Sequence, residues 1–543
     1  MAFKKQSYLQ IKKIVYTTQL YKTLKINSFM HTKIFSASTI GVDAHLIEVE
    51  VDLSFGLVNF FIVGLPDTAV KESSKRILTA LKNSGIPAPA KKITVNLAPA
   101  DLKKEGTLFD LPIAIGILQA AEHITIDNQF INETIFLGEL SLDGSIRFIK
   151  GALAIAYDAH KLGKKRIIVP LANATEASLI KDIEVIGVSH ITQLIAYLRK
   201  EIFIAPTKTN ITHHNDDQDM LDFNQVKGQH IAKRALQIAA AGRHNILFIG
   251  PPGAGKTMLA KRLLTIMPAM EFDEILQTSK IYSISGKLNN QPLVTKRPFR
   301  APHHTISQAG LVGGGSYPQP GEISLAHHGI LFLDELTEFK RHTLEVLRQP
   351  LESRTVNISR AQHSLSFPAS FLLVAATNPC PCGYWGDKKK QCVCSAQQIA
   401  RYLDKLSGPL LDRIDLQISI QSIEYDTIKN PTTSNQSSAD LLNGVTKAVG
   451  AQLERSKSLQ KIIWNAYLPA ELIETHCPLT PEAEAAVKKS FEALNLSMRG
   501  YHKLIKIART IADLESHSVI QLPHIQEALM YRSLDSHLER HKL

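Results

Sequence analysis

Cysteine is scarce in this sequence, which has five in 543 residues. Secreted domains that depend on disulfides carry far more, so the composition argues against an extracellular disulfide-stabilised protein. Four of the five nevertheless lie within fifteen residues, a clustering more typical of a metal site in a reducing compartment. These four are Cys380, Cys382, Cys392 and Cys394.

Long hydrophobic runs are also missing. No stretch approaches the ~20 consecutive apolar residues of a membrane-spanning helix. The longest runs, such as residues 246–249 and 330–333, have the length of a strand. The first 29 residues lack both the apolar stretch and the cleavage site of a secretory signal. We therefore expect a cytoplasmic protein.

Acidic residues are absent from residues 1–29, which hold six lysines. This segment therefore carries half of the formal net charge of +12, and the remaining chain is only mildly basic. Such a balance fits a solvated surface as well as a nucleic-acid partner. Residues 1–29 are either a disordered basic extension or a sign that the true start is Met30. The lysines are Lys4, Lys5, Lys12, Lys13, Lys22 and Lys25.

The rest of the chain divides by pattern into two α/β regions and a helical one. At about 150 residues per domain, the length predicts about three domains. The first region alternates strand-like and helix-like periods and has a hairpin turn at Asp143-Gly144. We expect an α/β domain at 30–204, a polar linker at 205–222, an α/β ATPase core at 223–430 with a cysteine loop at 380–394, and a helical domain at 431–543.

A glycine-rich loop follows the apolar strand expected at 245–249 and precedes a helix at 258–264. Its sequence, GPPGAGKT, matches the phosphate-binding loop in the required strand–loop–helix context. Glycines let the backbone N–H groups turn toward phosphate oxygens, the lysine adds a positive charge, and the threonine hydroxyl can ligate Mg²⁺. A chance lysine in a turn is a poor alternative here. The loop comprises Gly250, Pro251, Pro252, Gly253, Ala254, Gly255, Lys256 and Thr257.

Two further strands end in polar residues. Asp334 and Glu335 follow the apolar strand at 330–333, and Asn378 follows the strand at 371–375. Since ligands bind at the carboxyl ends of sheet strands in α/β folds, we expect Asp334 to hold Mg²⁺ and Glu335 to polarise the attacking water. Asn378 can orient that water, although alone it would be interpreted as a turn residue before Pro379.

With these three strand ends, the chain resembles the AAA+ ATPases, and among them the magnesium-chelatase-like ComM/YifB family. The resemblance covers nearly everything from Met30 on, and it favours Met30 as the true start because family members begin just before residues 40–43. It implies an α/β fold: an AAA+ P-loop module with a helical lid, preceded by a Lon-protease/S5-like α/β domain. The motifs are VKGQ (226–229), GPPGAGKT (250–257), RPFRAPHHT (297–305), PGEISLAHHGILFLDEL (320–336), ATNPCPCG (376–383) and SGPLLDRIDL (407–416).

The resemblance also implies roles for single residues. Arg413 matches the arginine finger that reaches the ATP of a neighbouring subunit, and Arg499 matches the lid arginine that senses the γ-phosphate. Alone, Arg413 would be interpreted as part of a helix-surface ion pair. Val226 matches the segment that contacts adenine. An arginine supplied by a neighbour implies a homo-oligomeric ring, expected to be a hexamer.

Basic groups gather in two insertions of the ATPase core, at 280–316 and 352–368. In related rings both insertions project into the central pore, where basic side chains grip a phosphate backbone. Solvated loops or subunit contacts are the alternative interpretation. The candidate DNA contacts are Lys287, Arg297, Arg300, Arg354 and Arg360.

The four clustered cysteines can supply a closed tetrahedral site for a structural Zn²⁺. Their C-x-C pairs need a bent chain, which Pro381 and Gly383 can provide. Free thiols or a redox-labile pair remain the alternatives. The first domain lacks a serine near the nucleophile position of Lon proteases in the matching stretch, 104–111, so we expect no peptidase activity.

The leading hypothesis is an ATP- and Mg²⁺-dependent ring motor on branched or single-stranded DNA, which drives branch migration in the recombination of transforming DNA. It follows from the resemblance to the ComM/YifB family. The alternative is the ATPase subunit of a magnesium-chelatase-like metal-insertion complex. An ATP-dependent protease is disfavoured by the missing serine.

Overall fold

The computed structural model describes residues 31–104, 106–209, 221–288, 291, 293–315, 318–359, 364–387, 389–422, 436–457 and 463–532. The basic extension 1–29 and most of the expected linker lie outside this part of the chain. The chain forms two compact units. The first comprises residues 1–213 together with 279–293, and the second comprises 214–278 and 294–543.

The first unit contains a four-stranded sheet in the order β1-β2-β4-β3. Strands β1, β2 and β4 pair antiparallel, and β3 joins β4 in parallel. Alternate residues of β4 are buried, as the period of a half-buried strand requires. The strands are β1 (His31–Ile40), β2 (Asp43–Ser54), β3 (Phe60–Val63) and β4 (Lys92–Ala98).

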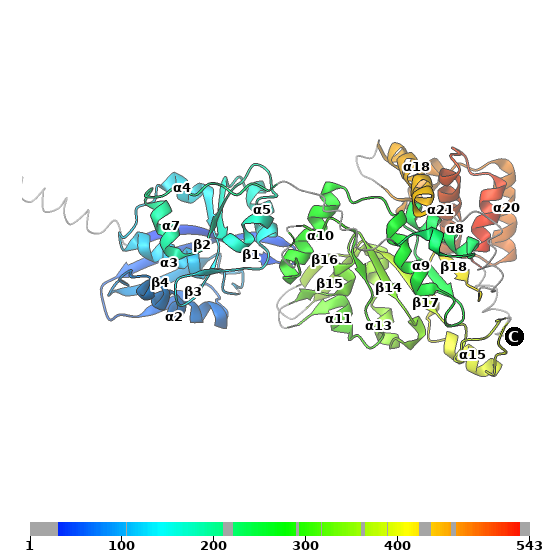
Figure 1. Cartoon of the computed structure of the whole chain (residues 1–543), viewed down its shortest axis with the longest axis horizontal. Coiled ribbons are helices and arrows are strands. Elements are labelled where there is room, and N and C mark those ends of the chain that lie inside the picture. The colour runs from blue at the N-terminus through cyan, green and yellow to red at the C-terminus, as the bar shows by residue number, and fades with distance from the viewer. Residues whose placement is uncertain are drawn as a thin grey trace, which may run out of the picture. The chain divides into compact units, whose positions relative to one another are not determined.

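Helix α3 (Asp110–Ala120) is buried along almost its whole length, packs against β1 and β2, and forms the centre of the first unit (Figure 1). A three-stranded parallel sheet in the order β5-β8-β9 completes this unit. Asp143 and Gly144 form the predicted turn of the short hairpin β6–β7, with Gly144 at a φ of 91°. The remaining elements are α2 (Thr68–Asn83), α4 (Asn128–Glu133), β5 (Thr134–Phe136), β6 (Glu139–Leu140), β7 (Ile146–Arg147), α5 (Ala152–Lys161), β8 (Arg166–Pro170), α6 (Leu171–Ala177), β9 (Glu184–Val188) and α7 (Ile191–Leu198).

The second half of helix α10 (Phe272–Ser285) belongs to the first unit, although the sequence placed it in the ATPase core. The Ser283 hydroxyl donates to Glu176, and the Ser283 carbonyl accepts from the backbone N–H of Gly151. Lys280 lies 3.5 Å from an Asp158 carboxylate oxygen. Through these polar contacts residues 279–293 belong to the first unit, whereas the residues on either side of them belong to the second.

The second unit is built on a five-stranded parallel sheet in the order β11-β14-β17-β10-β18. Strands β10, β14 and β17 are buried throughout, as expected for a sheet covered on both faces. Their register places Ile249 opposite Thr377 and Leu333 opposite Ala375, so the three strands end at one edge. The strands are β10 (Ile246–Ile249), β11 (Phe299–Arg300), β14 (Ile330–Leu333), β17 (Leu372–Thr377) and β18 (Leu416–Ser419).

The helical C-terminal part shares one hydrophobic core with this sheet, because residues such as Leu504 and Ile525 cluster with Ile246 and Leu372. Helices α18 and α21 pack against α8, as Figure 1 also shows. The helices of the second unit are α8 (His230–Gly242), α9 (Lys256–Arg262), α11 (Gln308–Val312), α12 (Glu322–Leu325), α13 (Arg341–Glu345), α14 (Arg348–Ser353), α15 (Ala396–Leu403), α16 (Gly408–Leu411), α18 (Ser438–Ser456), α19 (Ile473–His476), α20 (Pro481–Ala493), α21 (Met498–Leu514) and α22 (Leu522–Met530). Two small antiparallel pairs accompany them: β12 (Gly313–Gly314) with β13 (Gln319–Pro320), and β15 (Thr355–Ser359) with β16 (Ser364–Pro368).

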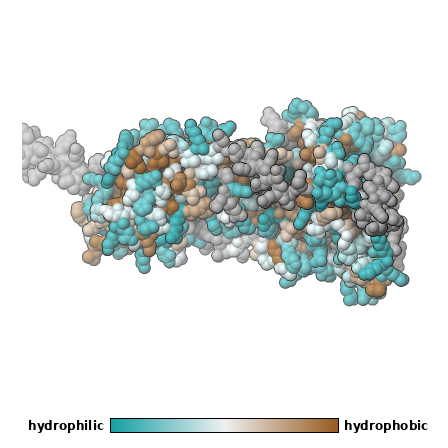
Figure 2. Space-filling view, in the orientation of Figure 1, coloured by the Kyte–Doolittle hydropathy of each residue, from teal (hydrophilic) through white to brown (hydrophobic). Residues whose placement is uncertain are grey.

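In the view of Figure 2, hydrophilic and hydrophobic residues are interspersed over the visible surface of both units. Across the described ranges, no helix combines the length and the apolar character needed to span a bilayer.

Candidate functional site

The glycine-rich loop connects the buried strand β10 to helix α9, as its sequence predicts. Gly253 and Gly255 adopt φ values of 78° and 87°, which side-chain-bearing residues rarely adopt. Gly250 is fixed by close packing, because a Cβ there would lie 2.3 Å from the carbonyl oxygen of Ile420. The loop therefore has the backbone geometry that a phosphate cradle needs.

Lys256 is buried and points back into the loop. Its Nζ donates to the carbonyl oxygens of Gly250 and Pro251, over 2.6 and 3.1 Å, and to Oδ1 of Asn378 over 3.0 Å. Burial lowers the pKa of this lysine. The structure thus brings together the loop lysine and the strand-end asparagine, which are 122 residues apart in the sequence.

Thr257 and Asp334 are also paired, since the Thr257 hydroxyl donates to Oδ2 of Asp334 over 2.7 Å. A hydroxyl and a carboxylate at this spacing offer two of the hard oxygen ligands that Mg²⁺ prefers. Both lie at the edge where β10 and β14 end. This pair could hold the Mg²⁺ that accompanies a nucleotide.

Glu335 has a left-handed backbone with a φ of 50°. Such a conformation is unfavourable for a residue with a side chain, and it is concentrated at functional sites. The Glu335 carboxylate is half exposed and lies 3.3 Å from Nδ1 of His304, whose ring packs edge-on against Phe339. His304 belongs to the insertion at 280–316, and the structure places it beside the carboxylate expected to act on water.

The two arginines implied by the resemblance converge on one carboxylate. Arg413 and Arg499 each donate to Oε1 of Glu352 over 2.7 Å. The Arg413 side chain is nearly buried, and that of Arg499 is half exposed. No local feature of the sequence marks Glu352, because its partners are 61 and 147 residues further along.

Val226 is fully buried in the core of the second unit. An adenine contact from this position would therefore come from the main chain rather than the side chain. The neighbouring Gln229 donates its side-chain amide to the carbonyl oxygen of Gln421 over 2.8 Å, which links this segment to the chain beyond β18.

The candidate DNA contacts have different environments. Lys287 is exposed in the first unit. The Arg300 guanidinium pairs with both carboxylate oxygens of Glu322, and Arg354 lies 3.9 Å from the ring centroid of Tyr467. Arg360 lies outside the described residues.

Arg297 corrects the expectation of a DNA contact. Its guanidinium is buried and donates to Glu274 and to the carbonyl oxygens of Pro268, Ala269 and His328. Burial lowers its pKa to about 10. A guanidinium with four internal acceptors is used for packing, so we do not propose that Arg297 binds phosphate.

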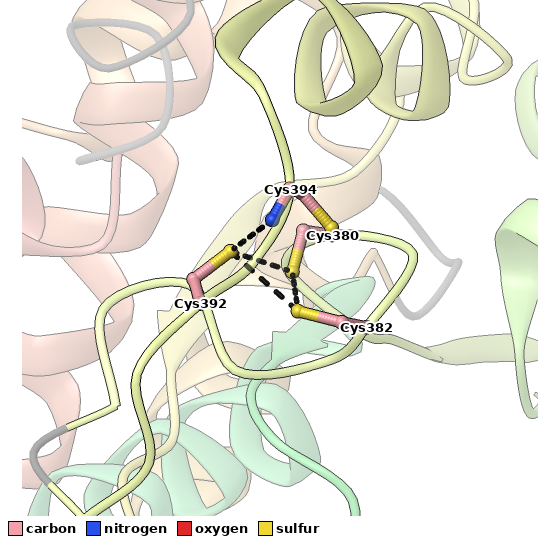
Figure 3. A group of neighbouring side chains, drawn as sticks. All are labelled: Cys380, Cys382, Cys392 and Cys394. Atoms are coloured by element: carbon pink, nitrogen blue, oxygen red, sulfur yellow. Dashed lines mark hydrogen bonds between the residues drawn. The ribbon is translucent and has the colours of Figure 1, made fainter.

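The four clustered cysteines converge as expected from their spacing (Figure 3). The Sγ atom of Cys382 lies 3.3 Å from that of Cys380 and 3.5 Å from that of Cys392, and Cys380 and Cys392 are 3.7 Å apart. All four sulfur atoms, including that of Cys394, lie within 4.8 Å of one another. The thiols are free, and their separations far exceed the ~2.05 Å of a disulfide bond.

Sulfur atoms around a tetrahedral Zn²⁺ at a bond length of ~2.3 Å are separated by about 3.8 Å, so this donor set fits such an ion. Gly383 adopts a φ of 84°, and its N–H donates to the carbonyl oxygen of Cys380, which supplies the expected bend. The N–H groups of Trp385 and Cys394 point at the sulfurs of Cys380 and Cys392.

Three models of the magnesium chelatase family match this chain in succession. They are the ChlI subunit of Mg-chelatase at residues 49–173, the magnesium chelatase subunit ChlI at 222–428, and the C-terminal region of ChlI at 435–532.

Two relatives match over almost their whole length. Competence protein ComM of Haemophilus influenzae is 43% identical over 505 residues, which covers 92% of this chain and 97% of the relative. YifB of Escherichia coli is 42% identical over 509 residues, which covers 94% and 97%. Lon protease 2 of Bacillus subtilis is 27% identical over 182 residues and covers 29% of this chain. This chain belongs to the magnesium-chelatase-like ComM/YifB family of AAA+ ATPases.

Proposed function

We propose that this chain forms a homo-oligomeric ring, a hexamer, that hydrolyses ATP to move DNA strands and drives branch migration during the recombination of transforming DNA. The observation that carries the proposal is the group of Lys256, Asn378, Thr257 and Asp334 at one edge of a parallel sheet. The name of the Haemophilus relative, a competence protein, supports a role in DNA uptake and recombination.

Each residue at this edge has a distinct task. Lys256 and the loop amides bind the phosphates, while Thr257 and Asp334 hold the Mg²⁺, which neutralises phosphate charge. Glu335 accepts a proton from the attacking water, and Asn378 orients that water. Arg413 contacts the ATP of the neighbouring subunit, and Arg499 of the helical lid senses the γ-phosphate.

Since Arg297 is excluded as a DNA contact, the DNA would contact the other candidate residues, namely Lys287, Arg300, Arg354 and Arg360. Arg300 is engaged by Glu322, so its phosphate contact would require exchange of that ion pair. Substitution of a phosphate-contacting residue lowers DNA affinity and reduces its salt dependence.

We also propose that Cys380, Cys382, Cys392 and Cys394 bind one structural Zn²⁺ per chain. Four thiolates leave no open coordination position, so this ion stabilises the fold and takes no part in hydrolysis. Elemental analysis of protein prepared without chelators should find about one zinc per chain.

A metal-insertion ATPase subunit is the second candidate, because the matching family models describe subunits of magnesium chelatase. ATP hydrolysis measured with and without three- and four-way DNA junctions separates the two. We expect junctions to stimulate hydrolysis and strands to exchange. If junctions neither stimulate hydrolysis nor exchange strands, the DNA motor is wrong and the metal-insertion function gains support.

A further inference from the structure

The cysteine cluster adjoins the nucleotide site in the chain itself. Cys380 lies two residues after Asn378, whose side chain accepts from Lys256. Both follow strand β17, which pairs with β10 immediately before the phosphate loop. The position of the asparagine therefore depends on how the chain is held at Cys380.

The cysteine loop, residues 380–394, also contacts the phosphate loop directly. A Cβ on Gly383 would lie 2.8 Å from Cδ of Pro252, so the two loops are in close contact at this point. A residue with a side chain at position 383 would displace one of the two loops. The positive φ of Gly383 is also unfavourable for such a residue.

A cleft separates the two loops further along. Its walls include Gly250 and Pro251 on one side and Trp385 and Asp387 on the other. Oδ1 of Asp387 accepts from the hydroxyl of Ser422 over 3.0 Å, which ties the cysteine loop to the chain beyond β18. The cysteine loop thus forms one wall of a cleft beside the phosphate loop.

Packing alone gives the cysteine loop little stability. Among its described residues only Cys380 and Gly383 are buried, and Val393 is 84% exposed. The apolar cluster at its base is small: Cys380 packs with Ile399, Tyr402 and Leu403, and the partly buried Cys382, Trp385, Cys392 and Cys394 lie against it. A segment with so few buried contacts opens readily unless another bond holds it, and four metal–sulfur bonds supply such a constraint.

We propose that the metal bound by the four cysteines fixes the cysteine loop against the phosphate loop, so that metal occupancy sets nucleotide affinity. The inference rests on the proposed nucleotide site and is independent of DNA. Loss of the metal releases Gly383 from Pro252 and leaves Asn378 without a fixed position beside Lys256. The phosphate loop and Asn378 must then be ordered when a nucleotide binds, and the cost of this ordering weakens the affinity for nucleotide.

The test uses the full chain and measures three quantities without DNA: zinc content, the visible absorption of Co²⁺-substituted protein, and the affinity for fluorescent mant-ADP. Wild-type protein should contain about one zinc per chain, and Co²⁺ should give the absorption of tetrahedral thiolate coordination. Cys382→Ser and Cys392→Ser should lose the metal and raise the mant-ADP Kd by about tenfold, the effect of losing one or two positioning contacts.

Two control variants should retain both metal and affinity. Val393→Ala changes an exposed residue of the same loop, and Cys477→Ala removes the cysteine outside the cluster. Gly383→Ala should weaken mant-ADP binding, because it disturbs the contact with Pro252. Circular dichroism checks that each variant is folded.

Wild-type protein without metal, or cysteine variants that lose zinc and bind mant-ADP as tightly as wild type, would overturn the inference. Metal-loaded protein that binds no nucleotide would overturn it together with the nucleotide site. If nucleotide binding depends on the metal but DNA junctions do not stimulate ATP hydrolysis, this inference stands and only the proposal of a DNA motor is wrong.

Discussion

Arg413 and Arg499 share one acceptor, Oε1 of Glu352, over 2.7 Å each. The two arginines that we propose to act as the arginine finger and the lid arginine are thus held together within a single chain. Nε of Arg413 is buried and has no hydrogen-bond partner among the described residues, so this arrangement does not satisfy the guanidinium fully. If both arginines bind nucleotide as proposed, Glu352 competes with the nucleotide for them.

Replacement of Glu352 should make assembly of active rings easier. In Glu352→Gln the amide no longer attracts the two guanidinium groups, so ATP hydrolysis should reach half its maximum at a protein concentration about two- to fivefold lower, because exposed ion pairs contribute up to about 1 kcal/mol. Hydrolysis measured across a dilution series tests this. Glu345→Gln, which removes the neighbouring pair with Arg348, is the control. A Glu352→Gln variant as inactive as Arg413→Ala would show that Glu352 is required.

Substitutions at the phosphate loop and at Glu335 should separate binding from chemistry. Lys256→Ala should abolish ATP binding, since it removes the ammonium group among the phosphate-facing donors. Glu335→Gln should bind ATP normally but hydrolyse it about 10²- to 10⁴-fold more slowly, the usual contribution of a general base. Equilibrium binding and single-turnover hydrolysis measure the two effects. Full turnover by either variant would contradict the assigned roles.

Asp334 should control the Mg²⁺ requirement. Asp334→Asn leaves a weaker ligand beside Thr257, so the Mg²⁺ concentration for half-maximal hydrolysis should rise at least about tenfold. The control is Glu338→Gln, which alters a surface carboxylate 4.0 Å from Lys405. An unchanged Mg²⁺ dependence in Asp334→Asn would place the metal elsewhere.

Glu274 should stabilise the second unit at neutral pH. Burial alone would raise the pKa of this carboxyl, but the hydrogen bond from His328 and the charges of Arg243 and Arg297 outweigh burial and hold the pKa well below its usual range. Glu274→Gln leaves two buried guanidinium groups without their counter-charge and should cost about 3–5 kcal/mol of unfolding free energy.

The effect should depend on pH with a defined sign. Because the folded-state pKa is depressed, the contribution of Glu274 is fully present above the unfolded pKa of about 4.3 and is lost as pH falls further. Denaturation curves at pH 7 and below pH 4 should therefore show a smaller difference between wild type and Glu274→Gln at the acidic pH. Glu271→Gln, on the exposed residue before the same helix, is the control, and an equal loss in both variants would count against this ion cluster.

The sequence predicts those parts of the site that are formed by residues close together in the chain. The phosphate loop and the Asp334-Glu335 pair each follow an apolar strand directly, so pattern and position suffice to place them at one sheet edge. The strand expected at 371–375 is observed as Leu372–Thr377, a shift that leaves Asn378 at its end.

Contacts across long separations could not be predicted in the same way. Arg297 follows a polar stretch that indicates exposure, yet its partner Glu274 lies 23 residues earlier and draws it into the interior. Glu352 meets Arg499 of helix α21 across 147 residues of sequence, because the C-terminal helices pack on the sheet. Likewise, the second half of α10 contacts Gly151, Asp158 and Glu176, which lie far earlier in the sequence, and it belongs to the first unit.

The three oxygen acceptors of the Lys256 ammonium group act as substitutes for a phosphate. If Lys256 binds phosphate as proposed, an incoming nucleotide would exchange these partners for its own oxygens, so little hydration would have to be stripped from the lysine. The exchange would also free the Asn378 amide to turn toward water. Under the proposed roles, nucleotide binding and the positioning of the attacking water would therefore be successive events in this pocket.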